Sequence, residues 1–120
     1  MPNTFPKHSK LCGKERIAAL YKGGKRFTAW PLRVTWQPTE GETQVLVWAS
    51  KSLFKHAVQR NRLRRLMREA YRLHQDILRI QDSEVRGRNY LIAFNYMDKE
   101  EQSFAVIEKA VVKALLKVKG

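Results

Sequence analysis

The sequence predicts a single α+β domain, spanning residues 1–120, with the element order αβββαβα. Two long stretches, 58–80 and 104–118, repeat apolar residues at helical spacing. Three shorter stretches, 27–37, 44–50 and 89–96, are rich in β-branched and aromatic residues, as strands are. With 120 residues, of which 43% are hydrophobic, the chain can bury roughly two thirds of its unfolded surface in one core.

The N-terminal part is expected to contain one short helix. Residues 1–9 include two prolines and are expected to be extended or mobile. Residues 14–22 then place apolar side chains, among them Ile17 and Tyr21, at helical spacing. The glycines at 23 and 24 are expected to end this helix through a left-handed cap.

The next two stretches are expected to be strands. Leu32, Val34 and Trp36 alternate with Arg33 and Thr35, which is the period of a half-buried strand. A turn sequence at 38–42 leads to the more apolar strand 44–50, and the two strands most simply form an antiparallel hairpin. The order αβββαβα further requires that the region around residue 27 supplies a short strand of its own.

The second half is expected to alternate helix, strand and helix. A long helix covers 58–80, a polar loop covers 81–88, and the apolar strand 89–96 has the composition of a central strand. Asp98 is expected to introduce the final helix. The apolar stripe of that helix consists of Phe104, Ile107, Val111, Ala114, Leu115 and Val118.

The helix at 58–80 has one apolar side and one cationic side. The expected apolar side holds Leu63, Leu66, Met67, Ala70, Leu73, His74 and Ile77, with Tyr71 and Leu78 at its edge. The opposite side holds Asn61, Arg64, Arg65, Arg68, Arg72 and Arg79, flanked by Arg60 and Arg62. Like charges four residues apart weaken an isolated helix, so the pattern indicates an anionic partner that relieves the repulsion.

The preference for arginine narrows the kind of partner. A guanidinium stays charged, donates two parallel hydrogen bonds to one phosphate and stacks on bases, which suits a folded polyanion. A solvated basic face or an import-like basic run is the plainer interpretation. A membrane-surface or calmodulin-target helix fits less well, because a small domain needs this apolar face for its core.

The overall charge agrees with a polyanionic partner. The net charge is +13, from 24 Lys and Arg against 11 Asp and Glu, so nucleic acid is the expected partner and an acidic membrane surface the second choice. Cys12 is the only cysteine, which excludes an intramolecular disulfide. The N-terminus lacks the apolar run of a signal peptide and no stretch reaches the length of a membrane span, so we expect a cytoplasmic protein.

The sequence contains no convincing catalytic constellation. His8, His56 and His74 are scattered and share no helical face with a carboxylate at metal-ligand spacing. No base lies near Cys12, and the two adjacent glycines lack the rest of a phosphate-binding loop. The chain itself is therefore expected to break no bonds and to bind neither a cofactor nor a small-molecule substrate.

Residues 57–72, AVQRNRLRRLMREAYR, resemble the RNR signature of the bacterial ribonuclease P protein family, and residues 49–56, ASKSLFKH, resemble the strand-to-helix connection of that family. A weaker resemblance runs from residue 5 to about residue 118. The resemblance implies a two-layer sandwich with a four-stranded mixed sheet, like the second domain of ribosomal protein S5. It also implies a left-handed βαβ crossover through the basic helix.

The resemblance further implies a function and two binding surfaces. The protein would bind the catalytic RNA of ribonuclease P and the 5′ leader of precursor tRNA, while the RNA, with bound Mg²⁺, cleaves the leader. The residues implied to bind the catalytic RNA are Lys51, Lys55, His56, Arg60, Asn61, Arg62, Arg64, Arg65, Arg68 and Arg72. The residues implied to bind the leader, between the first helix and the sheet, are Ile17, Tyr21, Arg33, Thr35 and Trp48.

Two other functions remain open at the level of the sequence. A general or ribosome-associated RNA-binding protein could use the same basic helix without any preference for a leader. A small basic nuclease would need a histidine or carboxylate constellation that the sequence does not provide.

Overall fold

The computed structural model describes residues 14–39, 43–79 and 89–119. The residues at 1–9 and the whole of the polar loop at 81–88 lie outside this part. The helices and strands are α1 (Lys14–Gly23), β1 (Lys25–Ala29), β2 (Leu32–Thr39), β3 (Gln44–Ala49), α2 (Ala57–His74), α3 (Asp76–Arg79), β4 (Asn89–Tyr96) and α4 (Phe104–Lys119).

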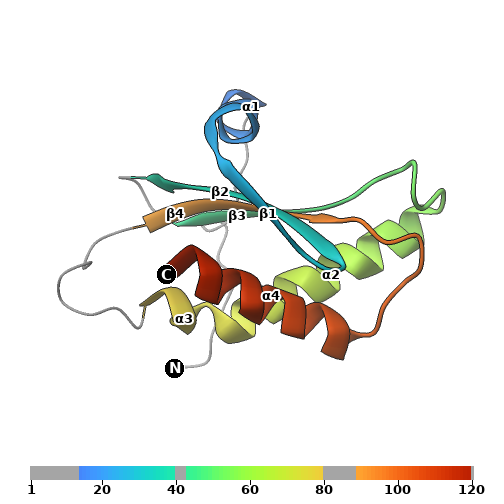
Figure 1. Ribbon diagram of the computed structural model, residues 1–120. Helices are drawn as coiled ribbons and strands as arrows, with labels where there is room; N and C mark the ends of the chain where they lie inside the picture. Colours follow the sequence, from blue (N-terminus) through green and yellow to red (C-terminus); the bar gives the residue numbers. More distant parts are fainter. Residues whose placement is uncertain (1–13, 40–42, 80–88, 120) are drawn as a thin grey trace.

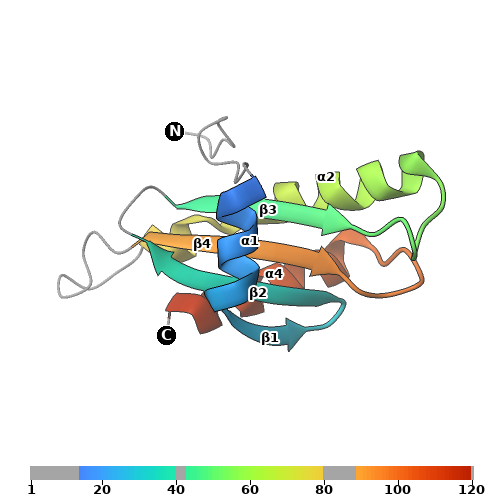
Figure 2. The ribbon, with the colours of Figure 1, turned by 90° about the horizontal axis from the view of Figure 1, so that it is seen from above.

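The four strands form one mixed sheet in the order β1-β2-β4-β3 (Figure 2). Strand β2 pairs antiparallel with β1 and β4, whereas β3 pairs parallel with β4. The expected hairpin between β2 and β3 is therefore wrong, because β4 lies between them. Five consecutive residues of β4, at 90–94, are buried, and such a strand requires a neighbour on each side.

The region around residue 27 supplies the expected extra strand. Strands β1 and β2 are joined by a tight turn at Trp30 and Pro31, whose peptide bond is cis. The order αβββαβα is confirmed, with α3 as a short addition after α2. The β3–α2–β4 connection joins parallel strands, and its left-handed sense stays a prediction from the family resemblance.

The helices cover the two faces of the sheet unequally (Figure 1). Helices α2, α3 and α4 lie on one face, and α1 alone crosses the other. The main core lies under α2 and α4, where Val34, Ile92, Phe94 and Ile107 are completely buried. A smaller cluster under α1 contains Leu20, Leu91 and Ala93. No helix in the described ranges is long and apolar enough to cross a membrane.

The expected helix at 58–80 is broken at Gln75 and is rotated relative to its expected apolar side. Leu63, Met67 and Ala70 are buried as expected, together with Tyr71, which was placed at the edge. In contrast, Leu73 is 41% exposed. The rotation follows from packing. Helix α2 contacts both α4 and β3, and the side of the helix that faces these two elements is the side that becomes buried.

The glycines at the end of α1 and Asp98 before α4 do not act as helix caps in the way that we expected. Neither Gly23, the last residue of α1, nor Gly24 has a left-handed φ; instead, the Gly24 N–H donates to the Leu20 carbonyl at 2.7 Å. A β-carbon on Gly24 would lie 2.6 Å from that carbonyl oxygen and 3.0 Å from the Trp36 carbonyl oxygen, so the position is reserved for close backbone packing. Helix α4 begins at Phe104, well after Asp98, with the Ser103 Oγ accepting from the Val106 N–H.

Candidate nucleic-acid interface

The connection between β3 and α2 is held by Arg60. The side chain of Phe54 is buried there against the Tyr96 ring, with 5.8 Å between ring centroids. The Arg60 Nη1 donates to the carbonyls of Phe54 and Lys55, at 2.7 and 3.0 Å. Arg60 therefore fixes the start of α2, in addition to any contact with a partner. The neighbouring Lys51, Lys55 and His56 are exposed.

Three arginines of α2 carry charge that no carboxylate neutralises. Arg64 and Arg68 are half-buried and Arg65 is exposed, and none of them forms an ion pair within the described part of the chain. Burial lowers the pKa of Arg68 below its ordinary value, and the positive charges of Arg64 and Arg65 lower it further. We call these three residues, with Asn61, the arginine face. A bound polyanion would relieve both the repulsion and the loss of solvation.

Two other predicted arginines already have acidic partners. Arg62 Nη1 lies 2.8 Å from Glu101 Oε1, a residue of the loop before α4. Arg72 is paired with Glu69, one turn back on α2, and this hydrogen-bonded pair lowers the pKa of Glu69 and raises that of Arg72. The charges of these two arginines are therefore partly neutralised within the protein, unlike those of the arginine face.

The sheet face that α1 crosses is partly open and polar. By strand register, Arg33 of β2, Asn95 of β4 and Trp48 of β3 lie side by side in one row across it. The Tyr21 hydroxyl of α1 is hydrogen-bonded to the Asn95 side chain, with contacts of 2.9 and 3.1 Å. Arg33 and Trp48 are exposed, the latter by 49%. We call the four residues Tyr21, Arg33, Trp48 and Asn95 the open sheet face.

The arginine face and the open sheet face meet at Trp48. The Arg64 guanidinium carbon lies 5.7 Å from the centroid of the Trp48 ring. A cavity of about 290 Å³ runs between β3 and α2 at this point, lined by both residues together with Leu46, Asn61 and Arg68. A chain of nucleotides on one surface could continue onto the other without leaving the protein, because stacking and guanidinium groups adjoin.

The structure brings most of the predicted leader-binding residues to one sheet face, but they differ in how accessible they are. Tyr21 and Ile17 are half-buried against the small cluster under α1. The side chain of Thr35 is 1% exposed, and so it is not accessible to a ligand. Asn95 was missed. In the sequence, Asn95 stands out only as a polar residue in an apolar strand. That observation points to an exposed polar surface only once β4 is known to be a central strand.

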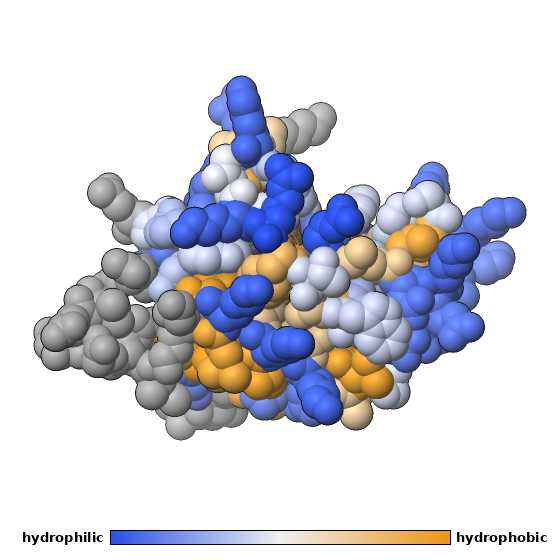
Figure 3. All heavy atoms as spheres, viewed as in Figure 1, coloured by the Kyte–Doolittle hydropathy of each residue, from blue (hydrophilic) through white to orange (hydrophobic). Residues whose placement is uncertain are grey.

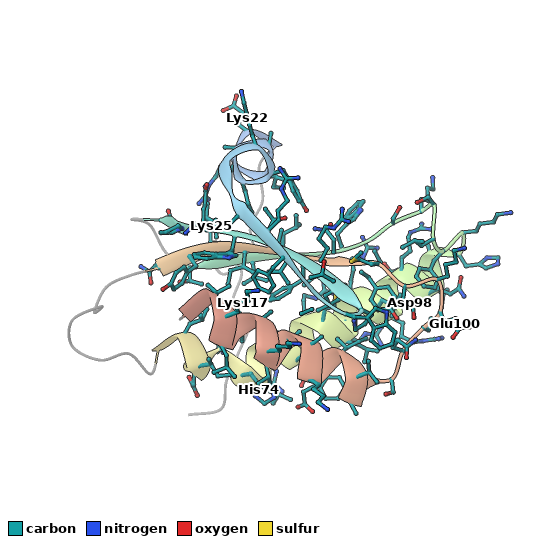
Figure 4. All side chains as sticks on the ribbon, in the orientation of Figure 1. Lys22, Lys25, His74, Asp98, Glu100 and Lys117 are labelled. Carbon is teal, nitrogen blue, oxygen red and sulfur yellow. The ribbon has the colours of Figure 1, made fainter. Side chains whose placement is uncertain are left out.

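The described residues contain no group of three histidine, cysteine or acidic side chains that could hold a metal ion. His74 lies on the helical side of the molecule, as Figure 4 shows, where its Nε2 is 2.9 Å from Glu108 Oε2. His8 and Cys12 lie outside the described ranges. The interface thus offers charge, stacking and hydrogen bonding.

Comparison with protein families gives a match over nearly the whole chain. The family model for ribonuclease P matches residues 5–119. A ribonuclease P protein component from Porphyromonas gingivalis is 33% identical over 127 residues, which cover 99% of this chain and 90% of the relative. One from Chlorobium phaeobacteroides is 43% identical over 77 residues, which cover 58% of this chain and 53% of the relative.

Solved structures show the same fold. The RNase P protein from Thermotoga maritima has a TM-score of 0.74 at 16% identity, with 92% of this chain and 98% of that chain covered. The Staphylococcus aureus RNase P protein has a TM-score of 0.67 at 17% identity, with 92% and 94% covered. At such identities the likeness concerns the fold alone.

Proposed function

The chain belongs to the ribonuclease P protein family, and from this premise we propose that it works with a catalytic RNA in removing 5′ leaders from precursor tRNA. In this proposal the RNA subunit performs the hydrolysis. The protein binds that RNA through α2 and binds the leader through the open sheet face.

The observation that carries the proposal is the unneutralised charge of the arginine face. Three guanidiniums crowd on one helix, two of them half-buried, without a carboxylate partner among the described residues. A buried or crowded charge is costly unless a partner compensates it. The phosphates of a folded RNA provide that compensation, and arginine contacts them in pairs of hydrogen bonds.

The leader is proposed to lie across the open sheet face. Unpaired bases stack on aromatic rings, and Trp48 is the exposed ring of this face. Arg33 would contact a phosphate of the same strand, while Tyr21 and Asn95 fix the surface between them. Since stacking and phosphate contacts accept any base, the presence of a leader should matter more than its sequence.

We expect Mg²⁺ to be bound by the RNA subunit. Among the described residues no three histidine, cysteine or acidic side chains are grouped so that they could hold such an ion. In the acidic segment before α4, Glu101 is paired with Arg62 and Gln59, and the Asp98 Oδ2 accepts from Gln102. No step of the proposal uses a metal held by the protein.

Reconstitution with a bacterial ribonuclease P RNA tests the proposal. The double variant Arg65→Gln/Arg68→Gln should bind this RNA more weakly, and its log-log salt dependence should flatten by about one unit per lost duplex phosphate contact. Lys22→Gln/Lys99→Gln, a change of equal charge at exposed positions of α1 and the loop before α4, serves as the control. Equal affinities and equal salt slopes for the two variants would remove the arginine face from the interface.

The leader requires a second measurement in the assembled enzyme. Precursor tRNA should bind more tightly than mature tRNA, and the difference should grow with leader length before it levels off. If the protein tightens RNA binding but gives the precursor no such advantage, it is a general RNA-binding protein instead.

A further inference from the structure

The outward side of α4 carries a second row of like charges. Lys109, Lys113 and Lys117 recur every four residues and are all exposed. The only acidic residue of α4 is Glu108, whose carboxylate is engaged with His74. Within the described ranges none of these lysines forms an ion pair. As on α2, such a row weakens the isolated helix unless an anion lies beside it.

The row continues onto the edge of the sheet. The Lys117 Nζ lies 4.8 Å from the centroid of the Phe27 ring in β1, and the Lys25 Nζ lies 5.3 Å from that of Trp36 in β2. Figure 4 labels Lys25 near the start of β1 and Lys117 on α4 below it. We call Lys25, Lys109, Lys113 and Lys117 the lysine face. In Figure 3, hydrophilic and apolar surface alternate on the side where these elements lie.

The lysine face is separate from the arginine face but shares a layer with it. The sheet order places β1 and β3 on opposite edges, and the arginine face adjoins β3 whereas the lysine face adjoins β1. Helices α2 and α4 pack against each other on the same side of the sheet. A large folded RNA that contacts α2 could therefore reach α4 along the same layer.

Building on the proposed function, we propose that the lysine face binds the phosphate backbone of a second, double-helical segment of the RNA subunit. The protein would then bridge two segments of one RNA. The leader is a less suitable occupant, because the sheet separates the open sheet face from α4.

The chemistry of the lysine face favours a backbone contact over base recognition. Ammonium groups act as point charges toward phosphate, and the deep, narrow major groove of an RNA duplex keeps base edges out of reach of side chains. Phe27 and Trp36 are half-buried and pack against the main core, so they offer less ring surface for stacking than the exposed Trp48 does. Lysines four residues apart on a helix are about 6 Å apart along its axis, which allows a regular row of contacts with one duplex strand.

Binding of full-length protein to a bacterial ribonuclease P RNA tests this inference. Lys109→Gln/Lys113→Gln should weaken binding roughly fivefold to tenfold per lost contact near 0.1 M salt and flatten the salt slope by about one unit per contact. Lys22→Gln/Lys99→Gln is again the charge-matched control. Hydroxyl-radical footprinting should show that the lysine variant exposes a different RNA segment from the one exposed by Arg65→Gln/Arg68→Gln.

The outcomes distinguish this inference from the proposed function. If the arginine variant loses affinity while the lysine variant behaves like the control, the lysine face is solvated surface and only the inference fails. If neither variant differs from the control, the proposed function fails as well. If the lysine variant weakens the binding of precursor tRNA to the assembled enzyme but not the binding of the RNA subunit, the occupant is the substrate and the proposal is overturned.

Discussion

The two faces of the sheet are built from the same strands but are covered to very different extents. On one face, α2 and α4 close a large apolar core in which Phe94 and Ile92 are inaccessible to solvent. On the other face, the ten-residue α1 covers a cluster of only three buried residues and leaves Trp48 exposed. The first face provides most of the buried apolar core, and the second is the face that we propose binds the leader.

This difference shows how one strand of a small domain can contribute both to the buried core and to an exposed surface. Successive side chains of a strand point to opposite faces, so Phe94 contributes to the core while its neighbour Asn95 contributes to the open sheet face. Substitutions at adjacent positions should therefore affect different properties. The following predictions test that separation, beginning with the largest expected effect.

Phe94→Ala should destabilise the fold by about 3–5 kcal/mol, because it removes a completely buried ring and leaves a cavity. Urea unfolding measures the loss. The loss should appear in the free energy of unfolding and in RNA binding together, since binding requires the folded state. A loss below about 1 kcal/mol would contradict the position of this ring at the centre of the core.

Gly24→Ala should destabilise by about 1–3 kcal/mol, because its β-carbon would collide with backbone carbonyls of α1 and β2 that cannot move independently. Gly23→Ala is the matched control, since the nearest atom to its β-carbon is 3.8 Å away. That control should be neutral or slightly stabilising. Equal melting temperatures for the two variants would show that α1 can shift on the sheet.

Trp48→Ala should change the free energy of unfolding by less than about 1 kcal/mol but should remove at least about 1 kcal/mol of leader-dependent binding, the usual contribution of one stacked base. Trp30→Ala is the control, because Trp30 is 59% exposed and lies in the β1–β2 turn. The readout is the ratio of precursor to mature tRNA affinity. If both variants keep the full ratio, the leader lies elsewhere.

Glu101→Gln should have the smallest effect of the four substitutions, and it should strengthen RNA binding where the others weaken binding or stability. It releases Arg62 from an exposed ion pair, so the RNA subunit should bind slightly more tightly, by less than about 1 kcal/mol. The gain should shrink at high salt, because screening weakens the competing pair and the new contact alike. Weaker RNA binding by this variant would mean that the ion pair positions Arg62 for its partner.

The sequence predicted the elements well because each has a strong local signal. The apolar periods at 58–80 and 104–118, the strand composition at 89–96 and the RNR signature all depend on neighbours in the chain. Strand pairing is different, since nothing local to β2 or β3 reveals that β4 lies between them. The expected hairpin was wrong for that reason.

For the candidate interface, which stays a prediction, the structure adds contacts that the sequence could not supply. The arginines were identified from their spacing, but their partners were not, because Glu101 lies 39 residues from Arg62. The burial of Thr35 and the participation of Asn95 both depend on where α1 crosses the sheet. The rotation of α2, which exposes Leu73 and buries Tyr71, likewise depends on its contact with α4.

The central position of β4 also constrains the order of events during synthesis. A ribosome delivers β1, β2, β3 and α2 before β4, so β2 emerges with one unpaired edge and β3 emerges with no strand partner. The sheet cannot close until residue 96 has left the exit tunnel, and until then these edges can pair with other chains. A nascent chain halted before residue 89 should consequently be susceptible to protease throughout. One extended past the end of β4 should acquire protection in a single step.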